Sequence, residues 1–228
     1  MEISVGRSLL ESNEQRAAEL AKIFAAHKIL ALNLISSPGA GKTSLLERTL
    51  SDLAGKYRMA VIEGDLQTDN DARRVEATGA KAVQINTRGG CHLDAKMILD
   101  ALPAFDLAGL DILFIENVGN LVCPVEFNCG EDHKISLLSV TEGDDKPEKY
   151  PLLFNLASVL LLNKVDLLPY VDFDMDRAMN FARAANKDLK IFPVCCRAKA
   201  QLQGGQSYAD GLSAWYAWLE EARKTKLR

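Results

Sequence analysis

The chain has 228 residues, a formal net charge of −4, and a composition of 48% hydrophobic and 25% charged residues. These values are typical of an ordinary globular protein, and the small negative charge does not favour nucleic acid or an anionic membrane as a partner. No apolar run approaches the roughly 20 residues that span a bilayer, and the first residues lack a signal-peptide pattern. The five cysteines follow no disulfide-framework spacing. We therefore expect a cytoplasmic protein whose cysteines are free thiols or metal ligands.

Helical and strand patterns alternate along the chain. Hydrophobic periodicity predicts helices at 7–27, 43–54, 70–78, 93–105, 173–186 and 211–224. Runs of valine, isoleucine and leucine predict strands at 28–36, 57–65, 80–86, 111–119, 134–143, 158–166 and 190–194. Such strands, alternating with helices, indicate an α/β fold with a mostly parallel sheet covered on both faces. We expect a helical segment at 1–27 packed on one domain at 28–228, with a strand order that the pattern leaves open.

A glycine-rich turn lies between the first predicted strand and the next helix. The stretch SSPGAGKTS (36–44) is typical of a P-loop, whose backbone N–H groups surround phosphate oxygens at a helix N-terminus. We expect Lys42 to neutralise the β and γ phosphates and Thr43 to ligate magnesium. Ser36 stands where the usual pattern has its first glycine, and the alternative is a glycine turn with an incidental lysine. The residues expected to contact the nucleotide phosphates are Gly39, Ala40, Gly41, Lys42, Thr43 and Ser44.

The stretch LLLNKVDLL (160–168) places polar residues at the end of a later strand. Asn163, Lys164 and Asp166 follow the P-loop at the distance expected of a base-binding motif. An aspartate at this position can accept hydrogen bonds from the N1 and N2 donors of guanine, which adenine lacks. We therefore predict a single P-loop domain that binds GTP and GDP, against the alternative of a polar strand end without a role.

Carboxylates close two further strands. Asp65 ends the predicted strand at 57–65, and Glu116 lies in the strand at 111–119. The carboxyl ends of parallel strands surround the ligand in such folds. We expect Asp65 and Glu116 to hold magnesium, directly or through water, and to orient the water that attacks GTP. Asp69 and Asp71 could instead begin the helix that follows.

Cys91 and His92 are adjacent in the stretch RGGCHLDAK (88–96), and Cys123 lies seven residues after Glu116. Two thiolates and one imidazole suit nickel or zinc. Water, Cys129, His133 or a second subunit could supply the fourth ligand. The alternative is that the cysteines are small buried apolar residues and that His92 caps the helix beginning near Leu93.

Several motifs in this order resemble one known family. They are SSPGAGKTSLLE, EGDLQTDNDARR, CHLDAKMI, IENVGNLVCPVEF, SVTEGDDKPEKYP and LLNKVDLLPYVDFD. From about residue 28 to 194 the chain resembles the hydrogenase nickel-incorporation GTPases, the HypB family. The resemblance implies a doubly wound P-loop fold, slow GTP hydrolysis, a GTP-dependent homodimer and nickel delivery to the large subunit of nickel–iron hydrogenase. It also implies a HypA-type nickel/zinc carrier as partner, and a nickel or zinc site at Cys91, His92 and Cys123 near the subunit interface.

Three alternatives stay open at this point. A related metal-delivery GTPase could serve urease or a cobalamin enzyme, a regulatory GTP switch could carry structural cysteines, and a P-loop kinase could contain NKVD by accident. The segment 195–211 departs from the short loop expected beside the guanine base, so the contacts of Cys195, Cys196 and Arg197 are not predicted beyond packing near that pocket.

Overall fold

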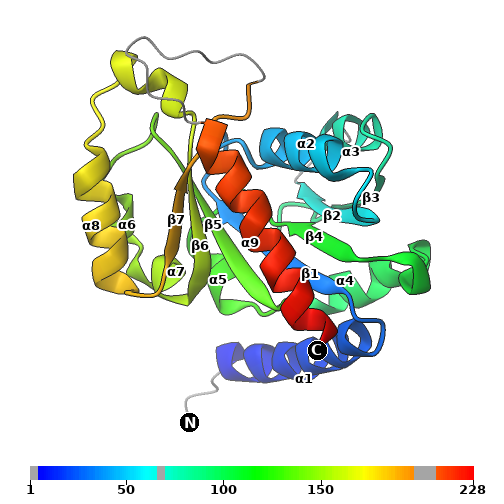
Figure 1. The fold of residues 1–228 in the computed structure, drawn as a ribbon. Coiled ribbons are helices and arrows are strands. Elements are labelled where there is room, and N and C mark those ends of the chain that lie inside the picture. Colours follow the sequence, from blue (N-terminus) through cyan, green and yellow to red (C-terminus); the bar gives the residue numbers. More distant parts are fainter. Residues whose placement is uncertain (1–4, 66–69, 198–208) are drawn as a thin grey trace.

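The computed structural model describes residues 5–65, 70–197 and 209–228. Its centre is one seven-stranded sheet in the order β3-β2-β4-β1-β5-β6-β7 (Figure 1), in which every neighbouring pair is parallel. The strands are β1 (Leu30–Ser36), β2 (Met59–Asp65), β3 (Lys81–Asn86), β4 (Ile112–Glu116), β5 (His133–Ser139), β6 (Ala157–Asn163) and β7 (Lys190–Pro193). The expected α/β fold with a parallel sheet is confirmed.

Helices cover both faces of this sheet. The longer ones are α1 (Val5–Ala26), α2 (Lys42–Leu53), α3 (Asn70–Glu76), α4 (Ala95–Ala101), α8 (Met175–Ala185) and α9 (Ala209–Leu227). The shorter ones are α5 (Cys123–Glu126), α6 (Lys146–Lys149) and α7 (Pro151–Leu156), with 3-10 turns η1 (Leu102–Ala104), η2 (Leu107–Gly109) and η3 (Val165–Tyr170). Residues of α2, α3 and α9 share one apolar cluster with the sheet, whereas α1, α4, α5, α7 and α8 contribute to clusters on the opposite face.

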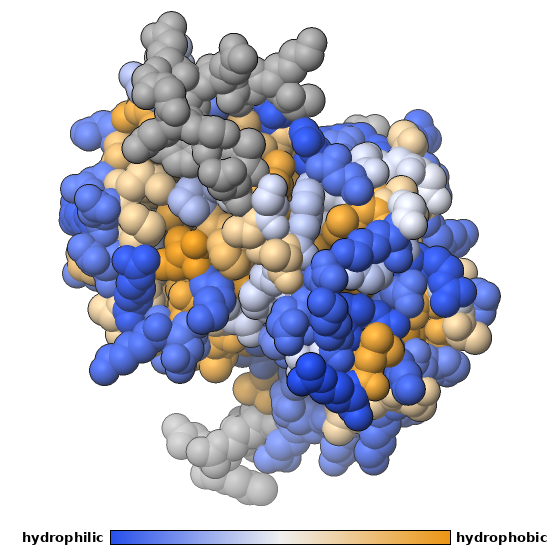
Figure 2. Space-filling model, in the orientation of Figure 1, coloured by the Kyte–Doolittle hydropathy of each residue, from blue (hydrophilic) through white to orange (hydrophobic). Residues whose placement is uncertain are grey.

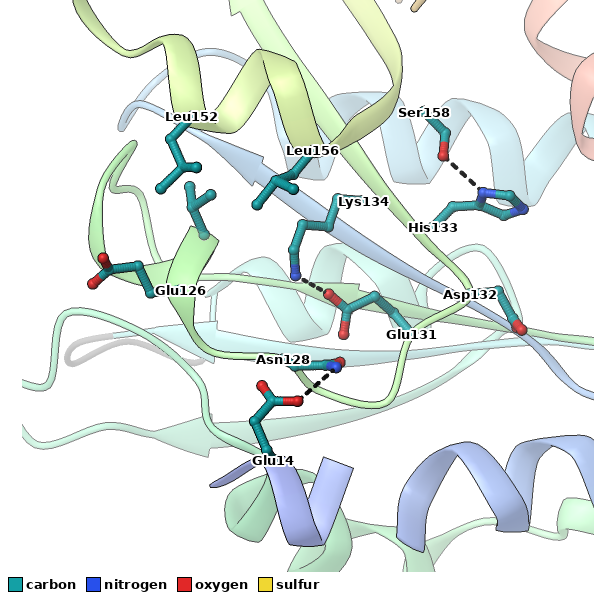
Figure 3. Close-up of a pocket in the computed structure, with 11 residues that line it drawn as sticks. Glu14, Glu126, Asn128, Glu131, Asp132, His133, Lys134, Leu152, Leu156 and Ser158 are labelled. Atoms are coloured by element: carbon teal, nitrogen blue, oxygen red, sulfur yellow. Dashed lines mark hydrogen bonds and ion pairs between the residues drawn. The ribbon is translucent and has the colours of Figure 1, made fainter. Parts of the chain in front are cut away.

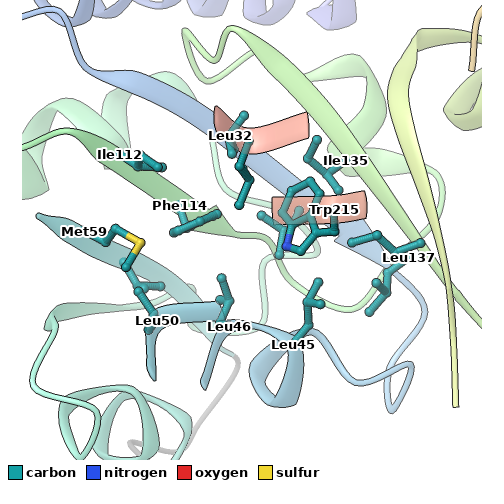
Figure 4. Close-up of a cluster of buried hydrophobic side chains, with 14 of the residues drawn as sticks. Leu32, Leu45, Leu46, Leu50, Met59, Ile112, Phe114, Ile135, Leu137 and Trp215 are labelled. Carbon is teal, nitrogen blue, oxygen red and sulfur yellow. The ribbon is translucent and has the colours of Figure 1, made fainter. Parts of the chain in front are cut away.

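The alternation of side chains along β1 explains how both faces are filled. Leu30, Leu32 and Leu34 belong to the cluster under α2 and α9, while Ala31 and Ile35 point to the other face. Figure 4 shows Trp215 of α9 lying among apolar side chains of β1 and β5. Its indole N–H donates to Thr49 Oγ1 of α2 at 3.1 Å, so the ring satisfies its polar atom inside the core.

Helix α1 packs along one end of the sheet (Figure 1), against α4. Ala17, Leu20 and Phe24 recur at helical spacing and are buried with residues of α4 and β2. Asn13 is buried beside them: its Oδ1 accepts from Ala95 N at 2.9 Å and its Nδ2 donates to Asn128 O at 2.8 Å. The helix therefore joins the start of α4 to the loop that follows α5.

The ends of several elements differ from the sequence-based expectation. The predicted strand at 158–166 ends at Asn163, because Lys164 adopts a left-handed backbone with φ +61° that no strand can continue. The predicted helix at 93–105 begins at Ala95, with Asp94 as its cap, and gives way to a 3-10 turn containing Pro103. Helices α5, α6 and α7, each with proline near its start, are absent from the prediction.

The face seen in Figure 2 is mostly hydrophilic, and apolar residues gather over β7 between α8 and α9. Within the described residues, no helix combines the length and the apolar character needed to cross a membrane.

Candidate nucleotide and metal sites

Two adjoining cavities lie at the carboxyl edge of the sheet, where β1, β2, β4 and β6 end. The larger, of about 420 Å³, lies over the loop 38–44 and the ends of β2 and β4. The smaller, of about 240 Å³, lies beside the end of β6. Gly41, Ser44 and Lys164 line both cavities. Open parallel sheets bind ligands at this edge, where the chain crosses from one side of the first strand to the other.

The loop before α2 holds a shape that requires glycine at residue 41. Gly41 has φ +102°, and a Cβ placed there would lie 2.5 Å from Asn163 Nδ2. Asn163 Nδ2 in turn donates to Ala40 O at 2.9 Å, and Lys164 Nζ donates to Gly39 O at 2.7 Å. The two predicted nucleotide motifs, more than 100 residues apart in the chain, are thus hydrogen-bonded to each other.

Lys42 is buried, and its ammonium group donates to Ser36 Oγ at 3.0 Å. Burial lowers the pKa of Lys42, and the negative charge of Glu116 is the strongest influence that opposes this. Ser36, which replaces the usual first glycine, therefore provides an oxygen for the lysine. An anion in the larger cavity would supply the negative charge that this buried cation lacks.

Thr43 donates from Oγ1 to Glu116 Oε1 at 2.9 Å. Glu116 is only 5% exposed, and its Oε2 has no hydrogen-bond partner among the described residues. Burial raises the pKa of Glu116 from 4.5 to about 7, although Lys42 and Thr43 act in the opposite direction. A hydroxyl and a buried carboxylate with one free oxygen fit magnesium, which prefers oxygen ligands.

Asp65 ends β2 as predicted, with its backbone in register with Asn86 of β3, but its side chain lies outside what the structure describes. The same strand carries a second acid, which the sequence made a weaker candidate than Asp65. Glu63 is 2% exposed, lines the larger cavity and is in register with Glu116 of β4. The sequence signal for Glu63 was its place two residues before Asp65, since alternate residues of a strand share a face.

The smaller cavity brings together the polar end of β6 and the segment after β7. Asp166, Cys195, Cys196 and Arg197 line it with Asn163. Cys196 Sγ donates to Asn163 Oδ1 at 3.5 Å, and burial raises the pKa of Cys196 to about 12, so the thiol keeps its proton. Burial and a hydrogen bond to Asp166 raise the pKa of Cys195 as well. Both cysteines thus lie beside Asn163 and Asp166, the residues predicted to bind the base.

Cys91, His92 and Cys123 converge on one point. One ligand atom of each lies within 4.8 Å of the others, and Cys91 Sγ is 3.4 Å from His92 Nδ1. A turn with Gly89 at φ +90° precedes Cys91, and Cys123 is the first residue of α5. Burial lowers the pKa of His92, which keeps its imidazole neutral and able to bind a metal. A hydrogen bond with Cys123 raises the pKa of Cys91, so this thiol keeps its proton until a metal displaces it.

The structure narrows the alternatives for this cluster. Asp94, not His92, caps α4, since its side chain accepts from Met97 N at 2.8 Å. His92 instead stacks on Phe127 with ring centroids 3.8 Å apart. Cys129 is buried with its thiol 3.5 Å from Leu93 O, and His133 bonds Ser158 at 2.8 Å. Neither Cys129 nor His133 lies in the three-residue cluster, so neither is placed to be the fourth metal ligand.

One buried side chain connects the two sites. Asn117, directly after Glu116, accepts at Oδ1 from Leu93 N at 2.9 Å and from Val118 N at 3.0 Å. Its Nδ2 donates to Asn33 Oδ1 of β1 at 3.2 Å. Leu93, which follows the candidate metal ligands Cys91 and His92, is therefore hydrogen-bonded to Asn117, which follows the candidate catalytic acid Glu116.

The prediction also missed a basic side chain at the rim of the larger cavity. Arg74 of α3 donates to Ser44 Oγ at 3.1 Å and pairs with Glu47 at 2.6 Å and Asp71 at 2.9 Å. Nothing in the local pattern of α3 separates this arginine from an exposed helix residue.

This fold and site define a P-loop nucleotide-binding domain with a thiol–imidazole cluster beside the nucleotide edge. The pattern of the CobW/HypB/UreG nucleotide-binding domain matches residues 30–193. Hydrogenase maturation factor HypB of Azotobacter vinelandii is 49% identical over 226 residues, which are 99% of this chain and 71% of that protein.

Two solved structures extend this likeness. HypB from Archaeoglobus fulgidus has a TM-score of 0.83 at 34% identity and covers 93% of this chain and 99% of its own. HypB from Helicobacter pylori, solved in complex with nickel, has a TM-score of 0.84 at 35% identity over 94% of this chain and 97% of its own. The chain belongs to the HypB family of hydrogenase maturation factors. The family predicted from the sequence motifs, and with it the assignment of a P-loop GTPase, is confirmed.

Proposed function

We propose that this protein binds and hydrolyses GTP in the paired cavities and carries nickel, or zinc, at Cys91, His92 and Cys123 for delivery to nickel–iron hydrogenase. The observation that carries the proposal is the convergence of these three ligand atoms within 4.8 Å, in a chain that also holds an assembled P-loop. The nickel complex of HypB from Helicobacter pylori supports nickel as the cargo.

The triphosphate lies in the larger cavity. The N–H groups of Gly39–Ser44 and the start of α2 face its oxygens, and Lys42, held by Ser36, neutralises the β and γ phosphates. Thr43, Asp65 and Glu116 would hold magnesium, which would supply positive charge to the phosphates. Asp65 and Glu116 orient the attacking water.

Guanine lies in the smaller cavity. Asp166 accepts from the two donors on its edge, while Asn163 and Lys164 keep the base pocket joined to the P-loop through Ala40 and Gly39. Base recognition is therefore coupled to the position of the phosphates. The match to this family disfavours a P-loop kinase in which NKVD has no role.

The metal is cargo and needs to leave. Three ligands from one chain would leave the fourth position of a zinc or nickel ion for water or for a residue of a second subunit, and we propose a GTP-dependent homodimer that brings two such sets together. Hydrolysis alters the loop between Glu116 and Cys123 and withdraws one thiolate, which weakens the site. A HypA-type carrier and the hydrogenase large subunit are the proposed partners.

We propose that the protein acts in the cytoplasm. All five cysteines are free, and a reducing compartment keeps thiols in this state. We propose residues 28–228 as the GTPase domain and residues 1–27 as a helical segment packed on it, because the described part of α1 shares a core with α4.

The test compares wild type, Cys123→Ala and Lys42→Ala in two assays, nickel binding by titration and phosphate release from GTP without an acceptor. We expect Cys123→Ala to bind nickel at least about tenfold more weakly while hydrolysing GTP at the wild-type rate. Lys42→Ala should bind nickel with wild-type affinity and lose GTP hydrolysis. Cys195→Ala, which also removes one thiol, is the matched control and should bind nickel normally. Wild-type nickel affinity in Cys123→Ala would contradict the metal assignment.

A further inference from the structure

A third cavity, of about 480 Å³, lies at the opposite edge of the sheet from the nucleotide. It is bounded by α1, α5, α7 and the first residues of β5 (Figure 3). We call it the α5–α7 cleft, and its wall and rim are formed by Glu14, Val125, Glu126, Glu131, Leu152 and Leu156. The function proposed above gives this cleft no role.

One wall of the cleft is apolar and open to solvent. Leu152 and Leu156 lie four residues apart on α7 and are 48% and 47% exposed. In Figure 3 both side chains extend from α7 toward the cleft. Val122, at the start of α5, is 54% exposed as well. Six large apolar side chains are exposed in the described part of the chain, and three of them lie on or beside these two short helices.

The remaining walls are acidic. Glu14, Glu126, Glu131 and Asp132 line the cleft, and Lys134 is the only lysine or arginine among its lining residues. Lys134 forms an ion pair with the buried Glu131, which cancels its charge. Burial lowers the pKa of His133, so the imidazole adds no positive charge at neutral pH. Asp132 pairs with Lys226 at 2.6 Å, whereas within the described chain no ion pair joins Glu14 or Glu126 to a basic residue. These two acids at the rim therefore carry uncompensated negative charge.

The cleft shares a structural element with the metal cluster. Helix α5 has four residues: Cys123 belongs to the cluster, whereas Val125 and Glu126 line the cleft. The next residue, Phe127, stacks on His92 with centroids 3.8 Å apart. A protein segment bound in the cleft therefore contacts α5, whose first residue is the candidate metal ligand Cys123.

We propose that the α5–α7 cleft docks a segment of a metal-exchange partner protein that carries leucine-like side chains flanked by lysine or arginine. The apolar side chains cover Leu152 and Leu156, and the basic ones pair with Glu14 and Glu126. Docking shifts α5 and so changes the hold of Cys123 on the metal. The proposal rests on the metal site proposed above, and adds to it a surface through which a partner controls metal release.

The test uses a fluorescein-labelled synthetic peptide of alternating leucine and lysine pairs, and a counterpart with glutamate in place of lysine. Anisotropy measures binding to the full chain with GDP. We expect the lysine peptide to bind at least about tenfold more tightly than its counterpart. The double variants Glu14→Lys/Glu126→Lys and Leu152→Ser/Leu156→Ser should each weaken it by about tenfold. Glu76→Lys/Glu221→Lys makes the same change in net charge at exposed positions outside the cleft, and should change affinity less than about twofold.

Three outcomes would overturn the proposal. Equal weakening by the control double variant would show long-range charge attraction without a docking site. If Leu152→Ser/Leu156→Ser binds the peptide as tightly as wild type, the apolar wall does not contact the peptide. If that variant loses self-association, the apolar wall contacts a second copy of the chain. Nickel affinity and GTP hydrolysis, measured on the same variants without peptide, should equal wild type. If wild type itself binds no nickel, the proposed cargo fails while the peptide result still reports on the cleft.

A kinetic measurement tests the link to the metal. Nickel release to a chromogenic chelator is followed with and without the lysine peptide. Release should accelerate about fivefold or more in wild type and stay unchanged in Glu14→Lys/Glu126→Lys. Peptide binding without any change in release would overturn the control of the metal through α5.

Discussion

Asn117 Oδ1 accepts a hydrogen bond from the backbone N–H of Leu93 at 2.9 Å, and Asn117 is 1% exposed. The bond joins the residue after Glu116 to the residue after His92, and so connects the nucleotide edge to the thiol–imidazole cluster. A buried hydrogen bond of this kind transmits a displacement, since neither partner has water as a replacement.

Replacement of Asn117 by alanine should therefore separate the two sites. Leu93 N–H would lose its buried acceptor, which costs about 1–3 kcal/mol in the free energy of unfolding. We also expect nickel affinity to become the same with a nonhydrolysable GTP analogue and with GDP. Denaturant unfolding and nickel titration measure the two effects.

Asn120→Ala is the matched control, because Asn120 donates to Cys91 O at 3.3 Å from a more open position. It should change the free energy of unfolding by less than about 0.5 kcal/mol and keep the nucleotide effect. Coupling that survives in Asn117→Ala would place the connection elsewhere.

Asp166→Asn should exchange guanine for xanthine as the preferred base. The amide no longer offers two acceptors to the N1 and N2 donors of guanine, but it offers a donor to the second carbonyl of xanthine. GTP affinity should fall by about 100-fold, with xanthosine triphosphate favoured instead. Competition binding with both nucleotides measures this, and undiminished GTP affinity in the variant would refute the base assignment.

Cys196→Ala should weaken GDP binding by about threefold to tenfold, because Asn163 Oδ1 loses its thiol donor at 3.5 Å and the amide is freer to turn away from Ala40. Cys196→Ser keeps a donor at this position and should restore most of the affinity. If serine and alanine give the same affinity, the thiol only fills space. Isothermal titration of GDP distinguishes these results.

Asp111 should make the protein sensitive to acid. Burial acts to raise the pKa of Asp111, but hydrogen bonds from Arg58 N at 2.9 Å and Arg223 at 2.9 Å lower it overall. A lowered pKa contributes stability above the ordinary value of 3.8 and loses it as pH falls through the folded-state pKa. Asp111→Asn should therefore cost about 1–3 kcal/mol at neutral pH, and the gap to wild type should close below about pH 4. A gap independent of pH would contradict this origin.

Much of the fold could be predicted because the strands are buried on both faces and appear as continuous apolar runs. The order of those strands could not, since parallel pairing depends on contacts between distant segments. The short helices α5 and α7 were missed for a local reason: four to six residues with proline at the start give no helical period.

The site divides in the same way. Cys91, His92 and Cys123 carry chemistry in their residue types, so their convergence could be predicted across about 30 residues of loop and strand. Asn117 could not, because a buried asparagine that bonds a distant backbone N–H has no pattern in the chain. Ser36 appeared only as a departure from a motif, and its bond to Lys42 shows what the departure provides.

The most direct test of the account is the nickel affinity of the full chain in its two nucleotide states. Nickel is titrated into protein saturated with a nonhydrolysable GTP analogue and into protein saturated with GDP, each with magnesium. The account predicts an affinity at least about tenfold weaker with GDP, because the loop from Glu116 to Cys123 no longer holds its thiolate in place. Equal affinities in the two states would contradict the coupling of GTP to the metal.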